Sequence, residues 1–262
     1  MKKTFVILFF LMTTSLFSQE RDISAIFSGS FMVYPEKGNF FGNHAFSFQA
    51  GLSIWDTVKV FGEILLPENF KEIEKSPIER LAKYSIKLGI WNAMMGYKKH
   101  FNIQDAKGDV TNIDLHYDIT RFADFGDIVF AGAYVGLIYQ KYNNGISNYD
   151  GYGLSAYMDT TTLSLLSRSD YAKLDKFDFI PWCKFGFAYT LGPNHYYEYP
   201  VSISYMVSWD VILGLGFIYN GFIPVCFSIG YNLAAYASDM FKGAPDNISR
   251  NEGLIANITL KF

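Results

Sequence analysis

Hydrophobic and polar residues alternate with a period of two along most of the chain. Segment 44–54 is a clear example: its apolar face holds every second residue from Phe46 to Ile54, and its other face holds Ser47, Gln49 and Ser53. Successive side chains of a β-strand point to opposite faces, so the segment predicts a strand with one apolar and one small or polar face.

The same alternation returns in further segments: 25–34, 58–66, 83–95, 109–121, 128–141, 151–161, 179–191, 199–208, 211–219, 223–236 and 252–262. Their lengths match the roughly 9–11 residues with which a tilted strand crosses a bilayer, whereas soluble strands average about 5–6. The pattern predicts about twelve strands. Ten or fourteen strands stay open, because 97–108 is long for a periplasmic turn and Trp209-Asp210 falls where an outer turn would lie.

The connections between these segments differ in length. Three are long and polar (67–82, 162–178 and 237–251), whereas 55–57 and Asn220-Gly221 are tight. Long loops on one side and short turns on the other are typical of outer membrane barrels. The uncharged run 211–238 leaves a membrane helix as an alternative, but the glycines and Pro224 near its middle favour a hairpin turn.

The first residues indicate export. Lys2 and Lys3 precede the uncharged, mostly apolar run 4–17, and cleavage is expected between Ser18 and Gln19. The alternative, an N-terminal anchor, would need a run of about 20 residues. We therefore expect a signal peptide at 1–18 and a single domain at 19–262. An exported chain that spans lipid without helices must pair every backbone group, so the prediction is an all-β, transmembrane, antiparallel up-and-down barrel.

Aromatic residues make up 18% of the chain, with 25 Phe and 19 Tyr. Tyrosines near strand ends are predicted to form girdles at the lipid interfaces, with these candidates: Tyr97, Tyr142, Tyr149, Tyr196, Tyr197, Tyr219 and Tyr236. The alternative is that they pack the core of a soluble barrel. The net charge of −3 and the lack of a basic cluster give no support for a nucleic-acid partner.

The final segment, Leu254 to Phe262, alternates and ends in Phe. Together with the export signal and the strand pattern, it resembles a bacterial outer membrane protein, in the style of the small barrels of the opacity and OmpW kind. The resemblance covers the mature chain as architecture only and fixes no subfamily. It implies residence in the cell outer membrane, contact with the lipid bilayer, and recognition of the strand ending in Phe262 by the barrel-assembly machinery.

The polar face of the strands would line the lumen. The predicted pore-lining residues are Gln49, Ser53, Lys59, Glu63, Lys87, Asp114, His116, Asp118, Ser204 and Asn232. About twelve strands lie between a filled barrel of about 8 and the aqueous channels of about 16–18. The sequence therefore predicts a narrow or plugged pore with a small solute as partner. The alternative is a non-conducting surface barrel whose loops serve adhesion or envelope integrity.

Asp114, His116 and Asp118 share the inward face of one segment. Such a set could bind a divalent metal or shuttle protons, but polar lumens also need paired charges, and the structural interpretation is favoured. We predict no metal and no cofactor. The chain carries no G-x-S-x-G, H-E-x-x-H or P-loop motif, so the sequence predicts that it is not an enzyme. A lipid-modifying enzyme would need an inward Ser or Thr beside a His near the outer rim.

Overall fold

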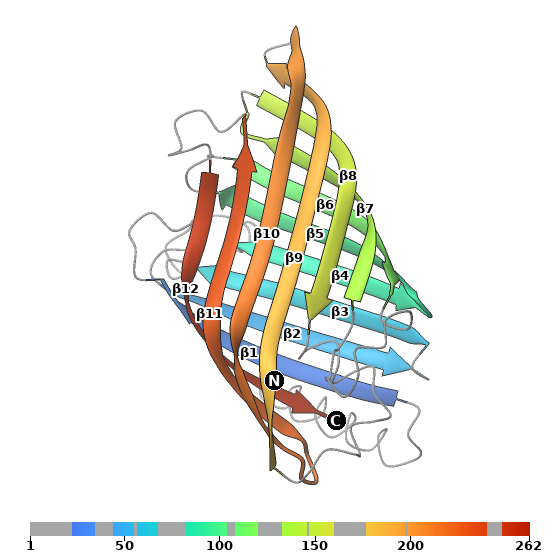
Figure 1. The fold of residues 1–262 in the computed structure, drawn as a ribbon, viewed down its shortest axis with the longest axis vertical. Helices are drawn as coiled ribbons and strands as arrows, with labels where there is room; N and C mark the ends of the chain where they lie inside the picture. The colour runs from blue at the N-terminus through green and yellow to red at the C-terminus, as the bar shows by residue number, and fades with distance from the viewer. Residues whose placement is uncertain are drawn as a thin grey trace, which may run out of the picture.

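The protein forms one closed antiparallel β-barrel of twelve strands (Figure 1). The architecture comes from a computed structural model, which describes residues 23–34, 44–54, 57–67, 82–103, 108–119, 133–145, 147–159, 177–196, 199–239 and 248–262. The predicted signal peptide, 1–18, lies outside these residues. The predicted fold class, an up-and-down transmembrane barrel of about twelve strands, is confirmed.

The strands follow one another in chain order. They are β1 (Ile23–Val33), β2 (His44–Ile54), β3 (Val58–Pro67), β4 (Lys83–Ile90), β5 (Ala93–Ile103), β6 (Gly108–Asp118), β7 (Ala133–Asn143), β8 (Ser147–Asp159), β9 (Phe177–Tyr196), β10 (Tyr199–Tyr219), β11 (Val225–Ser238) and β12 (Ile248–Lys261). Every strand pairs with its neighbours in sequence, and β12 returns to pair with β1. Because the barrel has an even number of antiparallel strands, the start of β1 and the end of β12 lie at the same end of the barrel. We call this end the terminal end.

The last residue takes part in closing the barrel. Phe262 N donates to Ala25 O at 2.7 Å, and Ala25 N donates to Phe262 O at 2.9 Å. The Phe262 ring lies edge-on to Phe27 with 5.9 Å between centroids. The predicted terminal strand is thus in place, and its recognition by the assembly machinery stays a prediction.

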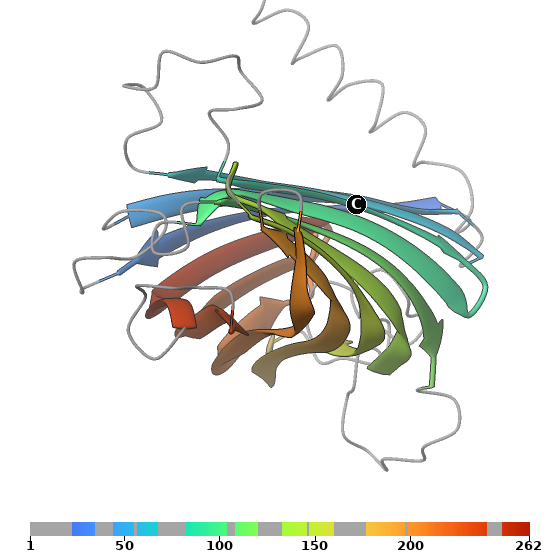
Figure 2. The same ribbon diagram turned by 90° about the horizontal axis from the view of Figure 1, so that it is seen from above.

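The barrel is flattened rather than round. In Figure 1 the strands β1 to β6 cross behind the steeper strands β9 to β12, and in Figure 2 the blue-to-green strands form one wall facing the yellow-to-red strands. A strong strand tilt is what closes a sheet of this size. The flattening brings side chains of opposite walls within reach of one another.

The distribution of apolar side chains is inverted relative to a soluble barrel. Phe48, Leu137 and Leu215 point outward and are 50%, 63% and 70% exposed. The inward side chains of Ser47, Asn112 and Gln140 are buried. An outer surface this rich in exposed apolar residues is stable only against lipid, and a closed barrel satisfies its backbone there. The protein is therefore a β-barrel of the outer membrane. Among the described residues, no helix is long and apolar enough to cross a membrane.

The strand count was predicted correctly, but two boundaries were wrong. Segment 83–95 is two strands, because Trp91 adopts φ 54° and turns β4 into β5 without Gly or Pro. Segments 199–208 and 211–219 are one strand, β10, because Asp210 faces the lumen and pairs with Lys184 instead of forming a turn. The two errors cancel in the count. Run 211–238 forms the end of β10 and β11, not a helix.

Two further expectations were wrong. Long and short connections are not sorted by side: β8 ends at Asp159 and β9 begins at Phe177 at the terminal end, where β2 and β3 are joined by a short turn. Tyr142, Tyr149 and Tyr236 do not form a girdle, because their phase turns them into the lumen, where they are 1%, 0% and 2% exposed. There Tyr149 Oη lies 2.8 Å from Thr190 Oγ1 on the neighbouring strand, and Tyr236 Oη lies 3.2 Å from His100 Nδ1 on a distant one.

Candidate functional site in the barrel lumen

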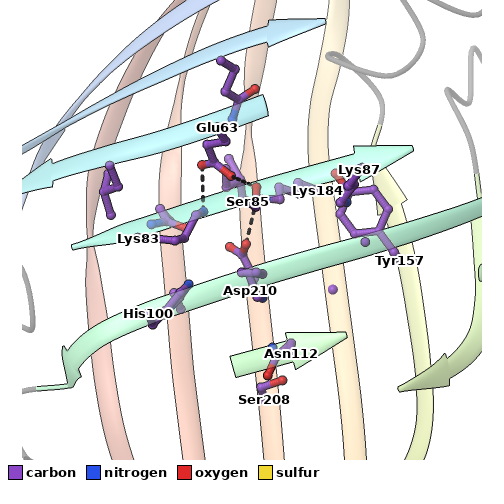
Figure 3. Close-up of a pocket in the computed structure, with 18 of the residues that line it drawn as sticks. Glu63, Lys83, Ser85, Lys87, His100, Asn112, Tyr157, Lys184, Ser208 and Asp210 are labelled. Carbon is purple, nitrogen blue, oxygen red and sulfur yellow. Dashed lines mark hydrogen bonds and ion pairs between the residues drawn. The ribbon is translucent and has the colours of Figure 1, made fainter. Parts of the chain in front are cut away.

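A cavity of about 180 Å³, lined by both charged and apolar side chains, lies inside the barrel. Its lining includes four lysines and three carboxylates: Lys83, Lys87, Lys98, Lys184, Glu63, Asp114 and Asp210. Figure 3 shows most of these side chains pointing into the same space from the two walls. The lining therefore has a small excess of positive charge.

Two ion pairs hold the charged walls. Lys83 Nζ lies 2.7 Å from Glu63 Oε1, and Lys184 Nζ donates to Asp210 Oδ2 at 2.7 Å (Figure 3). Ser85 Oγ lies 3.4 Å from the other Glu63 oxygen. The first pair comes from β3 and β4 and the second from β9 and β10. Each buried charge therefore has an opposite charge within contact distance, as a low-dielectric interior requires.

A hydrogen-bonded network crosses the lumen on the side away from the terminal end. Gln140 Nε2 donates to Asn112 Oδ1 at 3.3 Å and to Ser208 Oγ at 3.1 Å, and Gln140 Oε1 accepts from Thr190 Oγ1 at 2.8 Å. Tyr236 Oη lies 3.2 Å from His100 Nδ1, a contact between β11 and β5. All of these bonds except the one between Gln140 and Asn112 join strands that are not neighbours, so they narrow the passage.

Apolar side chains gather inside the lumen near the terminal end, beside buried polar residues such as Ser53 and Lys59. A cluster there combines buried side chains from six strands: Ile26, Phe61, Met94, Tyr134, Ile218 and Cys226. All six lie within four residues of the terminal-end limit of their strand. The cluster is called the apolar layer below. It lies on the terminal-end side of the barrel, and Phe61 also lines the cavity.

Three residues on one wall form a linear contact. His116 Nε2 lies 2.7 Å from Ser155 Oγ, and His116 Nδ1 lies 2.9 Å from Asp114 Oδ1. The second contact is an ion-pair approach, since Asp114 Oδ1 has no aligned hydrogen-bond donor. All three side chains are buried and line the cavity. The hydroxyl of Ser155, the imidazole of His116 and the carboxylate of Asp114 therefore contact one another in that order.

The strand register produces this contact. His116 on β6 is paired with Gly136 on β7, and Gly136 is paired with Ser155 on β8. A Cβ at Gly136 would meet Leu115 O at 2.0 Å and His116 Cα at 2.7 Å. The middle position must therefore be glycine, and its missing side chain lets the imidazole reach the serine across one strand.

A second glycine leaves space for the carboxylate of Asp114. Asp114 is paired with Gly96 on β5, and a Cβ at Gly96 would lie 2.4 Å from Asp114 Oδ1. Lys87, the residue paired with Gly96 on its other side, places its Nζ 3.8 Å from the centre of the Tyr157 ring. Tyr157 follows Ser155 by two residues on the same inward face (Figure 3 labels Lys87 and Tyr157). The ammonium of Lys87, which comes from β4, thus lies against β8, the strand that carries Ser155.

The predicted pore-lining residues fall into two groups. Those that line the cavity are Gln49, Glu63, Lys87, Asp114, His116 and Asn232. Ser53, Lys59 and Ser204 are buried away from it, and Asp118 is half-buried at the terminal end of β6. Their role in conduction stays a prediction. Asp118 does not join Asp114 and His116, and in the described ranges no three His, Cys, Asp or Glu residues gather as metal ligands.

Comparison with known proteins gives fold relatives only. No family profile and no curated protein matches the sequence. LpxR from Salmonella typhimurium has 12% identity and a TM-score of 0.36, over 90% of this chain and 99% of that one. The outer membrane protease OmpT from Escherichia coli has 9% identity and a TM-score of 0.32, over 92% and 96%. The outer membrane channel DcaP of Acinetobacter baumannii has 8% identity and a TM-score of 0.20, over 92% and 95%.

One of these structures is a protease, which corrects the prediction that this chain is not an enzyme. That prediction relied on the absence of a contiguous motif. In a barrel, reactive groups can come from different strands and meet through register, so no contiguous motif is needed. At these identities the comparisons carry no specific activity over to this chain. The closed barrel and its apolar outer surface identify an outer membrane β-barrel, with no subfamily fixed.

Proposed function

We propose that the protein is a narrow pathway for small solutes across the outer membrane, with a preference for anions. The observation that supports this best is the lumen cavity, whose lining holds one more lysine than carboxylates. Rings of fixed charge select ions by sign at close range. A volume of about 180 Å³ suits a small solute with a few waters.

The apolar layer is the proposed gate of this pathway. Hydrophobic constrictions block ions by losing their water, and they conduct once they become wet. Phe61 is the largest side chain of the layer after Tyr134. It lines the cavity together with Gly62 and Glu63. Removing its ring should widen and wet the narrowest apolar point.

Planar-bilayer recording of the refolded protein tests the proposal. Wild type should give small, infrequent current steps, and Phe61→Ala should raise the step size several-fold. Phe48→Ala removes an equal ring from the lipid side of β2 and should leave the steps unchanged, since Phe48 is 50% exposed on the outer surface. Absence of steps in all three proteins at every voltage would favour the alternative, a non-conducting surface barrel.

The ion selectivity of the pathway provides a second test of the proposal. In a salt gradient the reversal potential of wild type should indicate anion preference. Lys98→Gln removes one lysine from the cavity lining and should shift the reversal potential toward zero. A reversal potential that indicates cation preference in wild type would contradict the proposed sign.

A further inference from the structure

We infer that Ser155, His116 and Asp114 form a reactive-serine site inside the barrel, able to cleave small esters. The inference goes beyond solute passage, although both use the same cavity. It rests on the ordered contacts of the three side chains, the two glycines that make the contacts possible, and the adjoining space for a substrate.

The contacts assign a separate role to each group. Ser155 Oγ is the nucleophile, and His116 Nε2 at 2.7 Å is within reach of its proton. Asp114 lies 2.9 Å from Nδ1 and favours the tautomer with its proton on that nitrogen. Nε2 then has the free lone pair that a general base needs. Asp114 is a positioning residue, because it acts through the imidazole.

The wall is shaped around this set. Gly136 and Gly96 both lie at inward positions next to His116 or Asp114, and a Cβ at either would collide with the triad or its strand. The ion pair of Lys184 with Asp210 joins neighbouring strands, and although Asp210 is paired with Gly186, a Cβ there would come no closer than 3.6 Å to its neighbours. The bond from His116 to Ser155 instead crosses an entire strand.

The surroundings define the substrate class. Ser155 and Tyr157 face a cavity of about 180 Å³ whose lysines outnumber its carboxylates. Lys87, whose ammonium lies 3.8 Å from the centre of the Tyr157 ring, is the proposed source of positive charge for the oxyanion. The site therefore suits esters with short acyl groups that are neutral or anionic, and disfavours cationic esters.

The reaction balances with water as the only co-reactant. Ser155 Oγ bonds to the ester carbonyl carbon while Nε2 of His116 takes the hydroxyl proton. The carbon–oxygen bond to the alcohol then breaks, and the imidazolium returns its proton to the leaving oxygen. Water attacks the acyl-serine in the same manner, which releases the carboxylic acid and restores the serine.

Acylation of the refolded, detergent-bound full chain by p-nitrophenyl acetate tests this directly. We expect a release of p-nitrophenol and one acetyl group, placed by peptide mass spectrometry on Ser155. Ser155→Ala and His116→Ala should each lower the rate by more than about a hundredfold. Ser85→Ala is the matched control, because Ser85 is equally buried in the same cavity but lies beside Glu63 instead of a histidine. Heat-modifiability on a gel checks that each variant is folded.

Substrate access is measured with the Ser155→Cys variant and a small thiol reagent, against wild type with its two native cysteines. Faster labelling than wild type, together with acetylation of Ser155 in wild type, supports the site. Labelling of the cysteine without acetylation of the wild-type serine overturns the inference. Failure of the reagent to reach the cysteine also overturns it, since no substrate of this class could then enter. Acetylation spread equally over Ser155 and Ser85 has the same consequence.

Discussion

Two acidic groups that line the lumen cavity are held in different ways. Asp210 meets the ammonium of Lys184 at 2.7 Å and forms an ion pair with it. Asp114 instead meets the imidazole of His116, which in turn contacts the hydroxyl of Ser155. The first arrangement ends in a neutralised pair, whereas the second connects a carboxylate to a nucleophile through a group that can carry a proton. The difference separates an arrangement that holds the walls together from one that can perform chemistry.

The largest effect is expected at the lysine of the ion pair. Lys184→Met leaves Asp210 buried without its partner and should lower the free energy of unfolding by about 3 kcal/mol. Urea titration of the refolded barrel in detergent, followed by tryptophan fluorescence, measures it. A change under about 1 kcal/mol would mean that solvent in the lumen replaces the lysine, and the contrast between the two acids would lose its basis.

The next effect is expected at the carboxylate of the serine site. Asp114→Asn should lower kcat for p-nitrophenyl acetate about a hundredfold with KM unchanged, because the substrate touches Ser155 and not Asp114. Asp109→Asn, on the outer face of the same strand, is the control. An equal loss of kcat in both variants would show that Asp114 only stabilises the fold.

A smaller effect is expected at the glycine beneath the carboxylate. Gly96→Ala pushes the end of the Asp114 side chain aside and should slow acetylation of Ser155 about tenfold. Gly62→Ala, in the same cavity lining, meets nothing within 4 Å and should not change the rate. An unchanged rate in Gly96→Ala would show that the position of Asp114 is unimportant.

The smallest effect is expected at an exposed pair. Lys141 Nζ lies 3.9 Å from Asp150 Oδ1, with side chains 48% and 37% exposed. Lys141→Met should change the free energy of unfolding by less than about 1 kcal/mol in the same urea titration. A loss as large as that of Lys184→Met would indicate that burial is not what separates the two kinds of pair.

The sequence allowed the strand pattern and the inward face to be predicted, since a period of two needs no knowledge of neighbours. Asp114 and His116 were identified because they stand two residues apart on one strand. Ser155 was missed because its contact with His116 depends on the register of β6, β7 and β8. The available signal was an inward serine with a glycine between it and a histidine, which becomes visible only once the three strands are aligned.

Turns were predicted less well than strands. Trp91-Asn92 carries no Gly or Pro, and its turn requires a positive φ at a tryptophan. Aspartate is common in turns, but Asp210 lies in the middle of β10 because Lys184 on β9 faces its charge. In both places a contact distant in sequence overrode the local preference.

The closing seam between β1 and β12 has a consequence for how the chain is made. Every other seam joins strands that follow each other along the chain, so those hairpins can form as soon as their residues exist. The final seam alone must wait for β12, which follows all the other strands along the chain. Until then the sheet has two open edges, whose unpaired backbone groups lipid cannot satisfy. Stable insertion into the membrane is therefore coupled to the presence of β12, and a product that lacks this strand would have no stable place in the bilayer.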